Sequence, residues 1–182
     1  MRTLRPLFCL TLALSAVPAA GATCPALLNH RVQSIKGEAM DLCQYAGRVV
    51  LVVNTASYCG FTDQYRGLEA LNQKYRGRGL VVLGVPSNDF GAQEPGSNAQ
   101  VADFCERTYR VRFPMLEKTV VRGAGASPLY RQLAEQSGSP PAWNFHKYLL
   151  GRDGRLVGGY PSGVAPESEP LVAAIERALG AP

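Results

Sequence analysis

The sequence has few residues suited to binding a metal, a nucleotide or a nucleic acid. It contains two histidines, and no histidine or cysteine cluster has the spacing of metal ligands. Its glycines lack the layout of a phosphate-binding loop. Its 19 basic and 14 acidic residues are scattered, and no basic stripe interleaved with aromatic residues is present. We therefore expect no metal or other cofactor, and no nucleic acid as a partner.

The chain also lacks a hydrophobic run long enough to cross a membrane. Residues 1–22 come nearest, with two arginines near the start, a short apolar core and small residues up to Ala22. The core falls below the roughly 20 residues of a membrane-spanning helix, and the layout is that of a secretory signal peptide. Cleavage after Ala22 would leave a single domain, residues 23–182, in the periplasm or outside the cell. The alternative is a leader that stays uncleaved as an anchor.

Cysteine is scarce, but its number is even once the leader is set aside. Cys24, Cys43, Cys59 and Cys105 remain. Four cysteines in an oxidising compartment allow three pairings, and the sequence alone does not choose among them. Cys24 and Cys43 both precede the central strand, where a bridge would tie the N-terminal arm to the domain, so we expect a structural disulfide there. The other two are then redox-active, or else buried free thiols that act as small hydrophobic residues.

Cys59 lies between a buried strand and a helix. The uninterrupted run of β-branched and aliphatic residues at 49–53 is typical of a strand covered on both faces. After the cysteine, Tyr65, Leu68, Leu71 and Tyr75 share one helical face. A cysteine in the first turn of a helix lies at the positive end of the helix dipole, which favours the nucleophilic thiolate. The pattern predicts a reactive sulfur.

Strands and helices alternate along the rest of the chain. We expect a hairpin at 31–45, a buried strand at 79–85, a helix with a capping box at Ser97–Gln100, a helix from Ser127, a strand pair at 145–150 and 156–160, and a last helix ending at Gly180. Cys105 falls in the middle of the capped helix and is expected to face inward. This order is that of the thioredoxin fold. The expected class is therefore α/β, with a central mixed β-sheet flanked by helices and an N-terminal β-hairpin.

The reactive cysteine lacks a neighbouring partner. Thioredoxins carry Cys-x-x-Cys at this place, whereas here the fourth position is Thr62. A lone nucleophile with a distant second thiol fits this pattern better than a disulfide reductase.

Several separated motifs closely resemble the glutathione peroxidase family. They are Asn-Thr-Ala-Ser-Tyr-Cys-Gly-Phe-Thr at 54–62, Val-Pro-Ser-Asn-Asp-Phe-Gly-Ala-Gln-Glu-Pro-Gly at 85–96, Phe-Pro-Met at 113–115 and Trp-Asn-Phe-His-Lys-Tyr-Leu at 143–149. The resemblance implies that residues 23–182 form a peroxidase domain in which Cys59 attacks the peroxide. It also implies that Gln93, Trp143 and Asn144 complete a catalytic tetrad. Uncharged amide and indole donors suit a reaction in which negative charge moves from sulfur to oxygen.

The resemblance further implies a second thiol that reacts with oxidised Cys59 and so begins its return to the reduced state. Oxidised Cys59 would be a sulfenic acid, which condenses with a thiol to a disulfide. Cys105 lies in a segment similar to the resolving-cysteine segment of family members that use thioredoxin-like reductants. A thiol in mid-helix lies beyond the roughly 7 Å between Cα atoms that a disulfide tolerates, so the helix near Ser97 is expected to loosen.

Two departures from the family pattern bear on the reductant. Ser87 stands where many relatives have cysteine, and Phe61 stands where some glutathione-using relatives have a basic residue. The expected partners are a hydroperoxide substrate and, as reductant, a thioredoxin-like protein in preference to glutathione. The segment between Val121 and Trp143 is short and lacks the insertions that build tetramers, which favours a monomer.

Other interpretations remain open from the sequence. The chain could be an exported thiol–disulfide oxidoreductase or redox sensor, or a binding module without catalysis. A Cys59–His146 dyad of the hydrolase or transferase type is conceivable, because His146 and Asn144 share strand parity. Asp89 and Glu94 flank Gln93, and we expect both to be solvated loop carboxylates.

Overall fold

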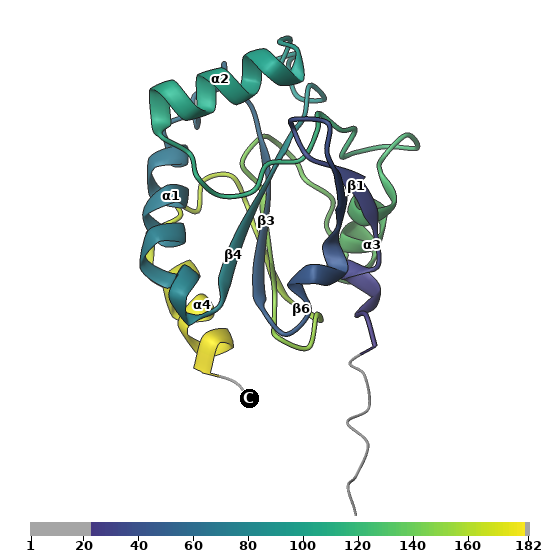
Figure 1. Ribbon diagram of the computed structural model, residues 1–182, viewed down its shortest axis with the longest axis vertical. Coiled ribbons are helices and arrows are strands. Elements are labelled where there is room, and N and C mark those ends of the chain that lie inside the picture. The colour runs from purple at the N-terminus through teal and green to yellow at the C-terminus, as the bar shows by residue number, and fades with distance from the viewer. Residues whose placement is uncertain (1–22, 181–182) are drawn as a thin grey trace, which may run out of the picture.

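The computed structural model describes residues 23–180 and contains a four-stranded mixed sheet with helices on both faces (Figure 1). The expected signal peptide, residues 1–22, lies outside the described residues. Within residues 23–180, no helix combines the length and the apolarity needed to cross a membrane.

The sheet is built around a central strand that is buried along its whole length. Its order is β4-β3-β5-β6, with β3 parallel to β4 and antiparallel to β5, and with β5 and β6 forming a hairpin. The strands are β3 (Val49–Thr55), β4 (Leu80–Pro86), β5 (Lys147–Leu150) and β6 (Leu156–Tyr160). Alternate residues of β3 enter different cores, with Leu51 on one face and Val50 and Val52 on the other.

Three helices contribute to the core on one face of the sheet. They are α1 (Gln64–Tyr75), α2 (Asn98–Tyr109) and α4 (Glu169–Gly180). In Figure 1, α1 and α4 lie together on the left and α2 crosses the top. The expected apolar face of α1 is confirmed, because Tyr65, Leu68, Leu71 and Tyr75 are all buried. Burial of each leucine contributes about 2 kcal/mol.

The opposite face is covered by α3 (Pro128–Ser137) and the N-terminal segment. That segment contains the expected hairpin, β1 (Arg31–Gln33) and β2 (Ala39–Asp41), between the short 3-10 helices η1 (Ala26–Leu28) and η2 (Leu42–Tyr45). A third 3-10 helix, η3 (Arg76–Arg78), connects α1 to β4. Cys24 and Cys43 are joined by a disulfide with a Cα–Cα distance of 5.5 Å. The bridge ties the start of the domain to the segment that leads into β3.

Most of the expected elements are present. Both hairpins form, the capping box of α2 is made by Ser97 and Gln100, and the fold class is confirmed. Cys105 faces inward from α2 and is buried, as its position in the helical pattern predicts. One expectation concerning the start of α1 is wrong, and it bears directly on Cys59.

Candidate active site

Cys59 lies in a turn ahead of α1, not in its first helical turn. The helix begins at Gln64, and the preceding residues form successive turns in which the Thr62 N–H donates to the Cys59 carbonyl at 3.0 Å. The Phe61 N–H approaches the Cys59 sulfur at 3.4 Å. The sulfur therefore meets a backbone donor of its own turn, and the helix-end position expected from the sequence is wrong.

The Thr62 side chain gives the physical reason for the delayed helix. Its hydroxyl accepts the Cys59 N–H and donates to the Ala56 carbonyl, both at 3.0 Å. Threonine hydroxyls that bond nearby backbone groups compete with helix formation. Thr62 occupies the place of the second cysteine in Cys-x-x-Cys proteins, so this residue both removes a thiol and shapes the turn.

Gln93 and Asn144 meet although 51 residues separate them. The Asn144 Nδ2 group donates to Gln93 Oε1 at 3.0 Å, and Asn144 is completely buried. The Trp143 ring approaches Gln93 across Gly91, because a Cβ placed on Gly91 would lie 3.5 Å from the end of the ring and from Gln93 Cγ, and Asn144 is the next residue in the chain. The three residues expected to complete the site are therefore gathered in one place.

Backbone hydrogen bonds connect this group to the Cys59 turn. The Tyr58 N–H donates to the Gln93 carbonyl at 3.1 Å, and the Asn54 side chain donates to the Trp143 carbonyl at 3.0 Å. Because β3 and β4 run parallel, their following loops emerge at one edge of the sheet, and the antiparallel β5 starts there. The carboxyl edge of such a sheet is where α/β proteins place ligands.

The surface around Cys59 is open and rich in aromatic residues. Tyr58 is 69% exposed and Trp143 is 39% exposed, while Cys59 is partly buried. A cavity of about 410 Å³ is lined by Ser57, Tyr58, Cys59, Gly60, Thr62, Asp63 and Tyr109. Solutes can thus reach the sulfur, and the exposed ring of Trp143 differs from a core aromatic residue.

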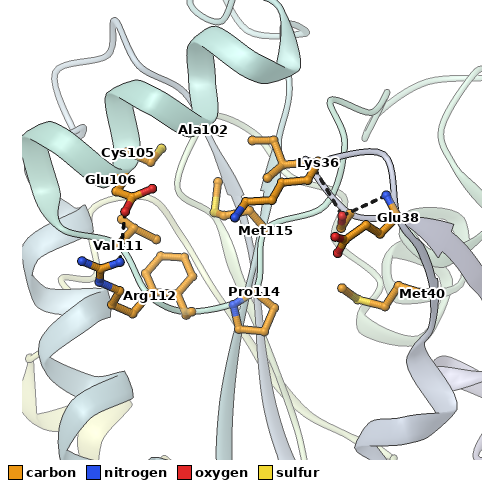
Figure 2. Close-up of a pocket in the computed structure, with 13 residues that line it drawn as sticks. Lys36, Glu38, Met40, Ala102, Cys105, Glu106, Val111, Arg112, Pro114 and Met115 are labelled. Carbon is orange, nitrogen blue, oxygen red and sulfur yellow. Dashed lines mark hydrogen bonds and ion pairs between the residues drawn. The ribbon is translucent and has the colours of Figure 1, made fainter.

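Cys105 faces a different cavity. The thiol is 2% exposed and lines a space of about 330 Å³ between α2, the β1–β2 hairpin and the segment at 111–115. Figure 2 shows Cys105 on the α2 side of this space, away from Glu38 and Met40 on the hairpin. Burial raises the pKa of this thiol to about 11, contact with the Tyr65 hydroxyl lowers it, and Glu94 raises it again. Within residues 23–180, Cys59 and Cys105 are the free cysteines, and the structure does not bring them together.

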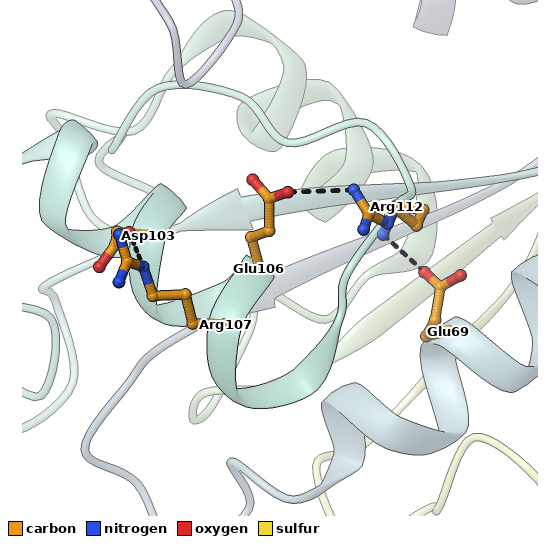
Figure 3. Close-up of polar contacts among 5 residues, drawn as sticks. All are labelled: Glu69, Asp103, Glu106, Arg107 and Arg112. Atoms are coloured by element: carbon orange, nitrogen blue, oxygen red, sulfur yellow. Dashed lines mark hydrogen bonds and ion pairs between the residues drawn. The ribbon is translucent and has the colours of Figure 1, made fainter.

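Polar contacts anchor the C-terminal end of α2. The Arg112 N–H donates to the Glu69 carboxylate at 2.8 Å, and the Arg112 guanidinium pairs with Glu106 at 3.0 Å (Figure 3). The same figure shows an ion pair between Asp103 and Arg107 one turn apart on α2. The Arg112 N–H contact with Glu69 joins the segment that follows α2 to α1.

Tyr109 forms a second anchor, close to the Cys59 cavity. Its hydroxyl donates to Asp63 at 3.1 Å, and Arg66 lies 5.0 Å above its ring. Both partners belong to the start of α1, so the two helices are joined beside the cavity that Cys59 lines.

His146 does not form a dyad with Cys59. Its ring packs at a tilt against Tyr148, with 4.6 Å between ring centroids, on the sheet face that Tyr148 shares with α3. Cys59 packs against the core on the opposite face of the sheet. Burial, followed by the nearby Lys147 charge, lowers the pKa of His146 to about 4. The imidazole is a neutral core residue.

Two polar residues stand out that the sequence interpretation missed or misjudged. Glu94 is 0% exposed, so the expectation of a solvated carboxylate is wrong, while Asp89 is half-buried and accepts the Val121 N–H at 2.6 Å. Asn54 is a buried amide at the end of β3 whose role as a connector was not anticipated. A polar residue that closes a strand of aliphatic side chains was the available signal.

Within residues 23–180, no group of three or more His, Cys, Asp or Glu side chains is placed to hold a metal ion.

Comparisons with known proteins assign the family. The family model for glutathione peroxidase matches residues 27–134, a range that contains Cys59, Gln93 and Cys105 and ends before Trp143. The chain is a member of the glutathione peroxidase family. The family resemblance drawn from the motifs is thus confirmed, and with it the expected class of enzyme, an oxidoreductase that acts on peroxide.

Individual relatives agree with this assignment. The hydroperoxy fatty acid reductase Gpx2 of Synechocystis sp. is 50% identical over 135 residues, covering 74% of this chain and 87% of that protein. Human glutathione peroxidase 7 is 46% identical over 153 residues, covering 83% and 82%. The crystal structure of Trgpx in its apo form superposes with a TM-score of 0.70 at 36% identity, over 86% of this chain and 97% of that one. A thiol:disulfide interchange protein of Chlorobium tepidum, with a TM-score of 0.64 and 16% identity over 89% of this chain and all of that one, shares the fold.

The low pKa of His146 predicts an acid-sensitive fold. The unfolded chain takes up a proton on this residue near pH 6.5, whereas the folded protein does so only near pH 4. The unfolding free energy should therefore fall as the pH drops through this window. In urea unfolding at about pH 7 and about pH 4.5, His146→Gln should lose about 2 kcal/mol less than the wild type.

An exposed side chain that does not titrate supplies the control for this measurement. Gln136→Ala should keep the acid sensitivity of the wild type. Equal losses in the wild type and His146→Gln would contradict the assignment of His146 as a neutral core residue.

Proposed function

We propose that the protein reduces hydrogen peroxide and organic hydroperoxides through Cys59, and that Cys105 then resolves the oxidised sulfur as a disulfide. The observation that carries this proposal is the Gln93–Asn144 amide pair, bound through the Gln93 carbonyl to the turn that holds Cys59. A pair of amides, one buried and one partly exposed, joined to the turn of an accessible sulfur has a chemical purpose in peroxide cleavage that a binding module would not need.

In the first step, the Cys59 thiolate attacks the outer oxygen of the hydroperoxide. A sulfur–oxygen bond forms, the O–O bond breaks, and the alkoxide or hydroxide leaves and takes a proton to become the alcohol or water. Cys59 is oxidised to a sulfenic acid while the peroxide is reduced. Charge thus moves from sulfur to oxygen, so neutral donors aimed at both atoms lower the barrier.

The amide pair divides this work between its two members. Asn144 is wholly buried and donates an N–H to Gln93 Oε1, which fixes the Gln93 carboxamide and leaves its own NH₂ group to serve as a donor. We assign to Gln93 and the Trp143 indole the donation to the reacting atoms, and to Asn144 the positioning of Gln93. This assignment refines the tetrad expected from the sequence, in which all three residues were donors of the same kind.

In the second step, the Cys105 thiol attacks the sulfenic acid of Cys59, a disulfide forms and water leaves. The two sulfurs line different cavities, so α2 has to open before they can meet. Ser87 is fully buried at the end of β4 and carries a hydroxyl, so it offers no alternative thiol.

A third step has to return the disulfide to two thiols. We assign this step to a thioredoxin-like protein in preference to glutathione, because Phe61 places an aromatic ring next to the turn of Cys59 where a basic side chain would attract the tripeptide.

We also propose that the chain is exported after cleavage at residue 22 and acts as a monomer. The Cys24–Cys43 bridge supports export, since structural disulfides persist in oxidising compartments.

Peroxide consumption by purified protein tests the function and the roles of the two thiols. Cys59→Ser should lose peroxide reduction altogether. Cys105→Ser should reduce one equivalent of peroxide and then stop when a thioredoxin system is the only reductant, because its sulfenic acid has no internal thiol. The assay is run with a thioredoxin system and, in parallel, with glutathione.

The outcomes separate the steps of the proposal. Full activity in Cys59→Ser would contradict the proposed mechanism. Sustained thioredoxin-supported turnover in Cys105→Ser would reassign the resolving step.

The donor role of Gln93 predicts a slower first step in Gln93→Ala. The rate constant for sulfenic acid formation should fall about 100-fold, the usual cost of removing one such donor. Stopped-flow mixing with peroxide measures it directly. Gln136→Ala, which removes an exposed glutamine on α3, is the matched control and should react at the wild-type rate. A Gln93→Ala rate within about twofold of the control would contradict the role.

Opening of α2 predicts faster amide exchange in the oxidised protein. Residues 98–109 should exchange their amide hydrogens faster after Cys59–Cys105 oxidation than in the reduced state, since helical hydrogen bonds are broken. Hydrogen exchange followed by mass spectrometry measures this. Peroxide-treated Cys105→Ser, which cannot form the bridge, should keep the protection of the reduced helix. An unchanged helix in the disulfide form would disprove the opening.

A further inference from the structure

Two glutamates are buried among residues 23–180, and only one of them has hydrogen bonds of normal geometry to its carboxylate. Glu69 accepts hydrogen bonds from the Arg112 N–H at 2.8 Å and from the side chains of Asn72 and Gln73 at 3.1–3.4 Å. Glu94 is 0% exposed, and neither of its oxygens has a hydrogen bond of normal geometry to any residue from 23 to 180. Glu69 thus serves the anchoring of α2, whereas Glu94 has no comparable structural role.

Glu94 is held in place by its backbone, not by its carboxylate. The Glu94 N–H donates to Asn88 Oδ1 at 2.8 Å. Lys118 supplies the positive charge that acts on the carboxyl, yet its Nζ donates to the backbone carbonyls of Glu94 and Gly96, at 3.2 and 2.6 Å. Burial of a carboxyl group whose oxygens lack hydrogen bonds of normal geometry opposes folding, so its persistence points to a use in the reaction.

The neighbours of Glu94 connect it to the resolving cysteine. Ser57, two residues before Cys59, lies against the carboxyl with its hydroxyl and N–H. The Tyr65 hydroxyl on α1 is completely buried, contacts the Cys105 thiol and the Thr55 hydroxyl, and is close enough to Glu94 to feel its charge. Tyr65, Thr55 and Ser57 all carry buried hydroxyls without a hydrogen bond of normal geometry within the described part of the chain. Ser57 thus links Glu94 to the Cys59 turn, and Tyr65 lies against Cys105 within reach of the Glu94 charge.

The second step of the reaction needs a proton acceptor at this place. Burial raises the pKa of Cys105 to about 11, so at neutral pH the thiol is protonated and a poor nucleophile. Burial also raises the pKa of Glu94, with the Ser57 contacts and Lys118 acting in the opposite direction. A carboxylate of raised pKa is a stronger base than a solvated one. The two acids that line the Cys105 cavity, Glu38 and Glu106, are both exposed, and Glu106 is paired with Arg112.

We propose that Glu94 accepts the proton of the Cys105 thiol during disulfide formation, and that the Tyr65 hydroxyl carries this proton between them. This role rests on the proposed function, since Cys105 needs a proton acceptor only if it attacks an oxidised Cys59.

The atoms and electrons balance within the two cysteines and the carboxyl group. As α2 opens, the thiol proton passes through the Tyr65 hydroxyl to Glu94, and a sulfur lone pair of Cys105 forms the bond to Cys59. The sulfur–oxygen bond of the sulfenic acid breaks, and the leaving hydroxide takes the proton from Glu94 to become water. Cys105 is oxidised, Cys59 is reduced from sulfenic acid to disulfide, and the carboxylate is regenerated.

The test is a single-turnover measurement that records the two steps separately. Reduced protein is mixed with hydrogen peroxide, and both peroxide loss and Cys59–Cys105 disulfide formation are followed across the acidic to alkaline range. In Glu94→Gln the ratio of the second rate to the first should fall about 100-fold, the usual contribution of a positioned base. Glu135→Gln, which removes an exposed carboxylate on α3, is the matched control and should keep both rates.

The pH profile distinguishes a proton acceptor from a structural residue. In the wild type, the rate of disulfide formation should rise to a plateau as Glu94 ionises. In Glu94→Gln that plateau should be lost, and the rate should climb about tenfold per pH unit toward the pKa of Cys105. Glutamine keeps the shape of the side chain, so a structural role would leave the profile unchanged.

Tyr65→Phe provides a second variant that keeps the buried ring and removes only the hydroxyl. It should slow disulfide formation about as much as Glu94→Gln does. The proposal is overturned if Glu94→Gln keeps the wild-type pH profile, or if Tyr65→Phe forms the disulfide at the wild-type rate. A failure of the proposed function would be seen instead in the wild type, as no peroxide loss or no Cys59–Cys105 disulfide.

Discussion

The site depends on the hydrogen bonds that Asn54 makes at the end of β3. Its side chain donates to the Trp143 carbonyl, its carbonyl accepts the Phe145 N–H at 2.6 Å, and its N–H donates to the His146 carbonyl at 3.3 Å. These three bonds align the segment that carries Trp143 and Asn144 with the strand that leads to Cys59. Because β3 is buried on both faces, the alignment is as rigid as the core itself.

Much of the fold could be predicted, because it follows from patterns within single elements. The aliphatic run of β3, the spaced side chains of α1 and the capping box of α2 each specify an element locally. The start of α1 could not be predicted as well, since it depends on whether the Thr62 hydroxyl bonds to the backbone or turns to solvent. In the structure the hydroxyl bonds to the Ala56 carbonyl, a contact that the local sequence pattern does not specify.

The site could be predicted only in part, and the reasons differ from those that apply to the fold. Cys59 was chosen from its place between a strand and a helix, and Gln93, Trp143 and Asn144 from the family resemblance; the structure gathers the last three through contacts between distant segments. The division of labour between Gln93 and Asn144 was not predictable, because burial decides which amide can face the substrate. Glu94 was misjudged since an acidic residue between a glutamine and a proline has the composition of an exposed loop. Its burial arises from contacts of its loop with residues distant in the sequence, such as Ser57 and Lys118, which local sequence does not record.

The anchoring of α2 has a consequence for how the proposed cycle depends on temperature. Helix opening breaks many weak contacts at once, so its rate rises steeply on warming, whereas attack on peroxide at an accessible sulfur needs no such opening. Cooling should therefore prolong the life of the sulfenic acid more than it slows its formation. In that interval a second peroxide can carry Cys59 to the sulfinic state, from which a thiol reductant does not recover it. In the proposed cycle, the contacts of Arg112 and Tyr109 thus set how long the Cys59 sulfenic acid is exposed to further peroxide.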